Sequence, residues 1–104
     1  MSGPVPPTRP RIPLFITGHI LATPGALLVL QRAGVQPMTL LTRHVFGDGG
    51  QLCDEDREAN RHAVAHGGRV FSSYWVGTGA KEERVWIITE ADRSSTTILR
   101  PEEY

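Results

Sequence analysis

The stretch "RVFSSYWVGTGAKEERVWIITEADRSSTTILR", residues 69–100, is the strongest indication of fold class in this chain. Three runs within it, 69–76, 83–90 and 94–100, alternate between the two faces of an extended chain and are rich in β-branched and aromatic residues. A glycine-containing loop at 77–82 separates the first two runs, which is typical of a β-hairpin. The sequence therefore predicts a three-stranded antiparallel meander near the C-terminal end.

Three helices are predicted upstream of this meander. Thr23 is a good N-cap, Pro24 suits the first helical position, and Gly34 suits the left-handed residue that ends a helix. We predict an α+β domain with a three- to four-stranded antiparallel sheet packed against two or three helices. The predicted helices cover 23–34, 37–46 and about 53–66, and an early strand at 14–21 supplies the fourth strand.

The first residues of the chain differ in composition from the rest. Prolines at positions 4, 6, 7, 10 and 13 fix φ and remove backbone donors, which predicts a proline-rich extended arm over 1–13. Residues 14–104 then form a single α+β domain. The arm has no apolar core of a signal peptide, and no run is long and apolar enough to span a membrane. With one cysteine, Cys53, no internal disulfide can form, and we expect a cytoplasmic protein without a membrane partner.

The charge balance bears on the class of partner. The whole chain is formally neutral, although residues 1–50 carry an excess of three positive charges and residues 51–104 an equal negative excess. Nucleic-acid binders usually show a basic excess, because phosphate neutralisation supplies much of their affinity. Nucleic-acid binding is therefore an alternative that the composition does not favour. Its candidate residues are Arg9, Arg11, Arg32 and Arg43.

Two loops carry the candidate catalytic residues. The loop "GDGG" at 47–50 places a carboxylate between glycines, and the turn "TEADRS" at 89–94 combines two carboxylates with an arginine. If the loops converge, the carboxylates could hold a divalent metal and the arginine a phosphate, as in a small hydrolase or nuclease. Local turn chemistry is the simpler interpretation of both loops. The candidate residues are His44, Asp48, Glu90, Asp92 and Arg93.

A zinc site is a weaker hypothesis. Glu58, His62 and His66 are spaced by four, so they project from one face of the predicted third helix. The spacing lacks the further ligand and the intervening glutamate of helical zinc motifs, so a charged outer face is the preferred interpretation. Cys53 is interpreted as a structural or incidental thiol. We expect neither a resident metal nor another cofactor.

Aromatic residues of the predicted sheet suggest a binding surface. Strand alternation places Phe71 and Trp75 on one face and Tyr74 on the other, and it gives both faces large apolar groups. An exposed aromatic patch would favour a protein partner or a homodimer. The candidate binding residues are Tyr74, Trp75, Trp86 and Arg93.

From about Leu21 to Tyr104 the chain resembles a family of small proteins encoded on bacterial plasmids and integrative elements. The residues that carry the resemblance are "LATPGAL" at 21–27, "RH" at 43–44, "GDGG" at 47–50, Tyr74, the region of Asn60, and "WIITEADRSSTTILRPEEY" at 86–104. Members are labelled "plasmid-related protein" or "type I restriction endonuclease subunit M". The family loop usually reads Gly-Asp-Trp-Gly, and Gly49 replaces that tryptophan here. A methyltransferase label does not fit a chain of 104 residues without a glycine-rich strand-turn-helix signature.

The resemblance implies a mobile genetic element as the setting and no established activity. We therefore expect an accessory protein that acts by binding another protein, with a host defence component as one conceivable target, rather than an enzyme. A metal-dependent hydrolase or nuclease built on Asp48, Glu90 and Asp92 is the alternative.

Overall fold

A computed structural model describes residues 12–104. All of the predicted arm except Ile12 and Pro13 therefore lies outside the described residues. The elements are β1 (His19–Ala22), α1 (Pro24–Ala33), α2 (Pro37–Val45), α3 (Asp54–His66), β2 (Val70–Val76), β3 (Glu83–Thr89) and β4 (Ser95–Leu99), with short 3₁₀ turns at Gly79–Lys81 and Pro101–Glu103. None of these helices is both long enough and apolar enough to cross a membrane.

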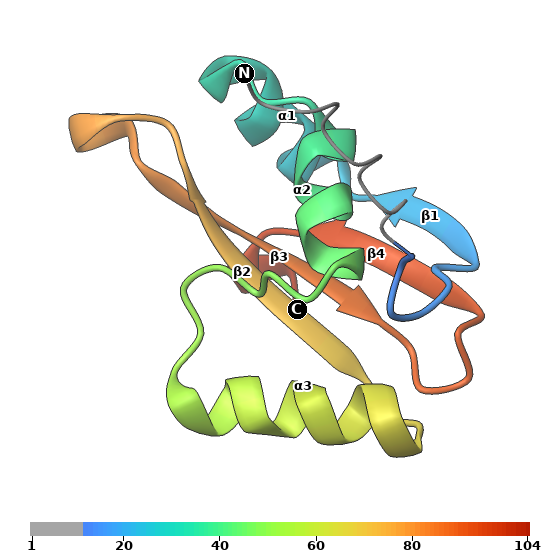
Figure 1. Ribbon diagram of the computed structural model, residues 1–104. Helices are drawn as coiled ribbons and strands as arrows, with labels where there is room; N and C mark the ends of the chain where they lie inside the picture. Colours follow the sequence, from blue (N-terminus) through green and yellow to red (C-terminus); the bar gives the residue numbers. More distant parts are fainter. Residues whose placement is uncertain (1–11) are drawn as a thin grey trace, which may run out of the picture.

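The four strands form one sheet in the order β1-β4-β3-β2 (Figure 1). β2, β3 and β4 pair antiparallel, as the alternating C-terminal sequence predicts. β1 joins the outer side of β4 in parallel, with Ile20 opposite Thr96. The α+β class is thus confirmed, while the sheet is mixed rather than wholly antiparallel. The long connection that such a parallel pair requires is the chain between β1 and β4, which contains the three helices, β2 and β3.

The ends of α1 follow the predicted capping chemistry. The Thr23 side chain accepts a hydrogen bond from the amide of Ala26 (3.1 Å), and Gly34 ends the helix with φ of 69°. α2 begins at Pro37 without a side-chain cap. α3 begins with three acidic residues, which the positive end of the helix dipole favours.

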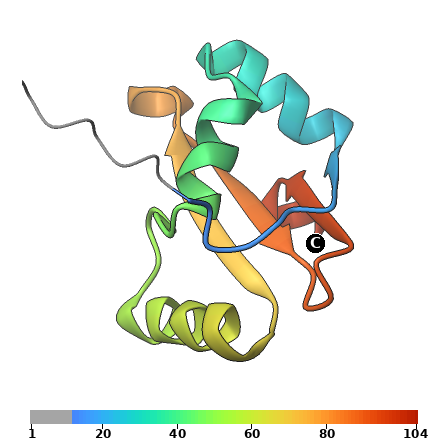
Figure 2. The same cartoon turned by 45° about the vertical axis from the view of Figure 1, so that its right-hand side comes forward.

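The three helices pack against one face of the sheet, and they bury two groups of apolar side chains. The larger group contains side chains of α1 and α2 and, from the sheet, Tyr74, Ile87 and Ile98. α3 lies farther along β2, where Ala63 packs with Val70 and with Phe15 from the segment before β1. Figure 2 shows this segment passing in front of the sheet between α2 and α3.

The outer edge of β2 is closed by residues that are distant from it in sequence. Asn60 of α3 bonds both backbone groups of Phe71: its Oδ1 accepts from the amide (3.0 Å) and its Nδ2 donates to the carbonyl (2.5 Å). The loop before α3 continues this cover, because Ser73 donates to Gly49 (2.9 Å) and accepts from Gln51 (2.7 Å). The edge is therefore protected from pairing with another strand.

Candidate functional site

His44, the first candidate catalytic residue, lies at the centre of a buried polar network. α2 directs its imidazole onto the sheet, where Nδ1 is 2.5 Å from the Ser72 hydroxyl and Nε2 is 2.9 Å from the Thr89 hydroxyl. Thr89 is in turn 2.7 Å from the Thr96 hydroxyl, which donates to the carbonyl of Thr17 (2.8 Å). The network joins α2, three strands and the segment before β1.

The last acceptor of this network fixes the direction of the bonds that run from Thr96 back to Nε2 of His44. The Thr17 carbonyl can only accept, so the Thr96 hydroxyl donates to it and accepts from Thr89. Thr89 then accepts from Nε2–H of His44, and in a neutral ring Nδ1 accepts from Ser72. The imidazole is neutral in this arrangement. Burial lowers the pKa of His44 from 6.5 to about 4, which is consistent with a neutral ring at pH 7.

Asp48, the second candidate, is held inside its own loop. Its carboxylate accepts from Arg43 Nε (2.7 Å) and from the Gly50 amide (3.0 Å). The guanidinium of Arg43 holds the pKa of Asp48 below its usual value. Tyr74 donates its hydroxyl to the Asp48 carbonyl (2.5 Å), and Arg43 lies over the Tyr74 ring. Each contact serves to fix the loop at the C-terminal end of α2.

Arg93, in the β3–β4 turn, ties that turn to α3. Its guanidinium donates to the carbonyls of Ala63 (3.0 Å) and Gly68 at the C-terminal end of α3, and to the carbonyl of Glu90 (3.2 Å). Carbonyls in the last turn of a helix lack intrahelical partners and attract a cation. Among the described residues other than glycine, Arg93 alone has positive φ, at 61°. The arginine is therefore a structural clamp, and it reaches α3 from a left-handed turn position.

We expect Arg93→Ala to lower the free energy of unfolding by about 2 kcal/mol, because three carbonyls lose a charged donor. Arg93→Gly should cost about 1 kcal/mol less than the alanine variant, since glycine adopts positive φ without strain. Urea denaturation of both variants measures the two costs. Equal stability of the unmodified protein and both variants would show that the Arg93 hydrogen bonds do not contribute to the free energy of unfolding.

The two remaining carboxylate candidates lie on the surface. Glu90 is exposed, and Asp92 is an exposed turn residue whose Oδ1 accepts from the Ser94 amide (2.9 Å). The Ser94 hydroxyl and amide hold the pKa of Asp92 below its usual value. The Asp48 carboxylate bonds to Arg43 and Gly50 and to no group of this turn, and residues 12–104 contain no cluster of three His, Cys, Asp or Glu side chains able to hold a metal. The geometry thus gives no support to the metal-dependent hydrolase.

The candidate binding aromatics are separated by the sheet, as alternation predicts. Tyr74 has 0% of its surface exposed and belongs to the core, so it cannot contact a partner. On the opposite face, Trp86 lies between the rings of Phe71 (5.0 Å) and Tyr104 (5.8 Å). Trp75 is 46% exposed and is covered by the guanidinium of Arg84 (4.6 Å). Arg93 belongs to the clamp described above. Of the four candidates, only Trp75 offers a large exposed surface.

Two of the four candidate nucleic-acid-binding residues lie in the described chain, and their surroundings differ. Arg32 is exposed on α1, whereas Arg43 is bound to Asp48. Arg9 and Arg11 lie outside the described residues.

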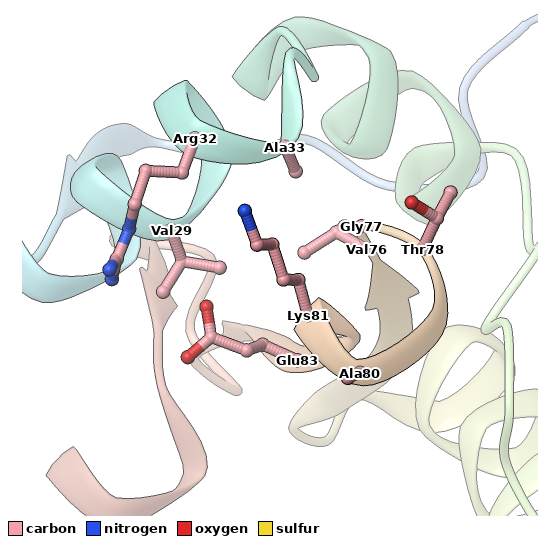
Figure 3. Close-up of a pocket in the computed structure, with 9 residues that line it drawn as sticks. All are labelled: Val29, Arg32, Ala33, Val76, Gly77, Thr78, Ala80, Lys81 and Glu83. Carbon is pink, nitrogen blue, oxygen red and sulfur yellow. The ribbon is translucent and has the colours of Figure 1, made fainter.

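A hollow of about 500 Å³ lies between the end of α1 and the β2–β3 hairpin. Figure 3 shows Lys81 extending across it from the hairpin toward α1, between Val29 and Val76. A cation is favoured near the C-terminal end of a helix. Lys81 lines this space and points toward the end of α1, and we interpret the hollow as a contact region between hairpin and helix.

A different surface has the properties expected of an interface. Residues 13–17, α2 and β1 enclose a groove of about 340 Å³, and none of the described residues that line it is charged. Its rim is formed by three exposed apolar side chains: Ile16 (72%), Ile20 (48%) and Met38 (62%). Phe15, Leu41 and Val45 also line it. We call this feature the uncharged groove.

The sequence signal for this groove is a bias in composition rather than a motif. Between positions 12 and 42 the chain has one formally charged side chain, Arg32. The same stretch supplies eight of the ten large apolar side chains that are exposed in the described chain. Exposed apolar surface of this extent marks an interaction site more often than it marks an ordinary monomer surface.

Comparisons with known proteins add no family to this picture. No protein-family model, no curated protein and no solved structure matches the chain. Its function must therefore be argued from its own geometry.

Proposed function

We propose that this chain is an accessory protein of a mobile genetic element and acts by binding another protein. In the proposed complex, an extended apolar segment of the partner pairs with the outer edge of β1 and places side chains in the uncharged groove. The observation that carries the proposal is the position of the groove: Ile20 both lines it and belongs to the edge strand.

The backbone of β1 supports strand addition. His19 donates to Ser94 (3.0 Å) and Thr23 donates to Ile98 (3.0 Å), so alternate residues of this segment face β4. The amide and carbonyl groups of Ile20 and Ala22 consequently point away from the sheet. No strand of the described chain pairs on that side, because β1 is the end of the sheet. An extended peptide can use such an edge for main-chain hydrogen bonds, while a neighbouring groove selects its side chains.

The chemistry of the groove defines the occupant. Its lining is apolar apart from Thr17 and Thr42, so an incoming charge would lose hydration without gaining a partner. The partner segment should therefore carry apolar, uncharged side chains at the alternate positions that enter the groove.

A second copy of this chain fits the groove less well than another protein does. In a two-fold dimer the same patch lies on both sides of the contact. Each groove would then have to be filled by the rim side chains of the other copy, with no separate segment to fill it. A protruding segment from a different protein can fill the groove and pair with the edge of β1 at the same time.

The setting on a mobile element rests on the resemblance of residues 21–104 to plasmid-encoded proteins. Given that setting, we propose a component of a host defence system as the partner, by analogy with small proteins that block such systems.

The proposal is tested by substituting the groove and an equally exposed control position. Ile20→Asp and Met38→Asp place a carboxylate on the rim, and both side chains are exposed enough for the fold to tolerate the change. Leu28→Asp is the control, because Leu28 is similarly exposed on α1 and is not a lining residue of the groove. Proteins retained by the tagged full chain are identified, and their affinities for all variants are measured.

We expect a partner whose affinity falls at least about 30-fold with either rim variant and stays unchanged with Leu28→Asp, because an unpaired buried charge costs several kcal/mol. Equal retention by all variants would refute the role of the groove. Self-association as the sole contact, measured by light scattering, would replace the foreign partner with a second copy. A chain that retains nothing at micromolar concentration would refute protein binding.

A further inference from the structure

A second cavity, separate from the uncharged groove, lies between α2, α3 and β2. Its volume of about 520 Å³ is in the range of small-molecule sites. Apolar side chains from four parts of the chain line it, including Phe15, Leu52, Val64 and Val70. A small apolar group could therefore displace water from this space favourably.

His44 and Ser72 line the same cavity and are buried. Their mutual hydrogen bond leaves the imidazole neutral and uses the Ser72 proton. Neither side chain of this hydrogen-bonded pair carries a charge. The inner part of the cavity is consequently neutral, and a ligand charge would find no opposite charge there.

The charged lining residues come from one side, α3. Arg57 and Arg61 are one helical turn apart, and both line the cavity while remaining exposed. Arg57 is anchored to the carbonyls of Leu52 (3.2 Å) and Gly50 (2.8 Å). Arg61 bonds to Glu58 (2.9 Å), an exposed pair of the kind that contributes little and can exchange partners.

We infer that this cavity binds a small amphipathic anion. The apolar part of the ligand lies among Phe15, Val64 and Val70, and its carboxylate pairs with Arg61 beside the fixed charge of Arg57. This inference does not depend on the proposed protein-binding function, because the groove and the cavity share only Phe15 among their described lining residues.

The test is an amide NMR titration of the full chain with octanoate, and with octan-1-ol as the uncharged analogue. Octanoate should shift the amides around Val64, Val70 and Ser72 saturably, and it should bind at least about fivefold more tightly than octan-1-ol. Arg61→Gln should remove that preference, because it retains the length of the side chain without its charge. Arg32→Gln, an exposed arginine on α1, is the matched control.

Val64→Trp fills the cavity and should abolish binding of both compounds in a variant whose spectrum shows that it is folded. Equal affinity for octanoate and octan-1-ol would overturn the anionic preference. The absence of saturable shifts, or shifts confined to Ile16, Ile20 and Met38 of the uncharged groove, would overturn the cavity as a ligand site. The last result would leave the protein-binding proposal untouched, and failure to find a protein partner would leave this titration untouched.

Discussion

Gly50→Ala is expected to lower the free energy of unfolding by roughly 3–4 kcal/mol, the combined cost of a left-handed alanine and of overpacking. Gly50 has φ of 71°, which alanine adopts only with strain. Its added methyl would lie 2.6 Å from Cδ1 of the buried Tyr74 ring and against the Ser73 carbonyl. The loop would have to withdraw from β2, so the bonds of Gly49 and Gln51 to Ser73 that close this edge would weaken.

Gly34→Ala isolates the conformational part of this cost. Gly34 has φ of 69°, close to that of Gly50, and a methyl there would meet no atom within 4 Å. This variant should lose about 1 kcal/mol. Urea denaturation at one pH measures both variants. If they lose equal stability, the close approach of the "GDGG" loop to β2 is not what requires glycine at position 50.

The second large effect is a loss of stability in acid that depends on His44. Burial lowers its pKa in the folded protein to about 4, while the unfolded chain titrates near 6.5. Between these values only the unfolded state takes up the proton, so the free energy of unfolding falls as pH decreases. The loss is about 1.4 kcal/mol per pH unit and about 3 kcal/mol in all. Above pH 6.5 the neutral His44 imidazole makes its full contribution to the free energy of unfolding.

His44→Gln removes this dependence and keeps hydrogen-bonding groups near Ser72 and Thr89. The variant should be less stable than the unmodified protein at pH 7.5, and the difference should shrink by about 3 kcal/mol as the pH falls to 4. His62→Gln, on exposed α3, controls for removing an imidazole as such. A constant difference between pH 7.5 and 4 would mean that His44 is protonated as readily in the folded protein as in the unfolded chain.

Local sequence signals predicted much of the fold. Alternation placed Trp75 and Tyr74 on opposite faces of the sheet, and Thr23 and Gly34 bounded the first helix. These features depend on neighbours only a few residues away. The parallel pairing of β1 with β4 depends on partners that are 76 positions apart at Ile20 and Thr96, and no local pattern encodes that distance.

The sequence correctly placed the candidate residues in a turn and a loop, but it did not predict which groups those residues contact. Glu90 and Asp92 do lie in a turn, and Asp48 does lie in a glycine loop. Their partners could not be predicted, because Arg93 reaches α3, which precedes it by some 30 residues, and Asp48 is bound by Arg43. The groove escaped notice because Ile16 and Met38 have ordinary apolar identities, and only their exposure distinguishes them.

Hydrogen exchange of the β1 amides tests the central claim most directly. In the free chain the outward amides of Ile20 and Ala22 have no strand partner among residues 12–104, whereas Leu21 faces β4 and serves as the internal control. With the partner present at about 100 times its dissociation constant, exchange at Ile20 and Ala22 should slow by about 100-fold. Unchanged exchange at these two amides in a complex that does form would contradict strand addition at β1.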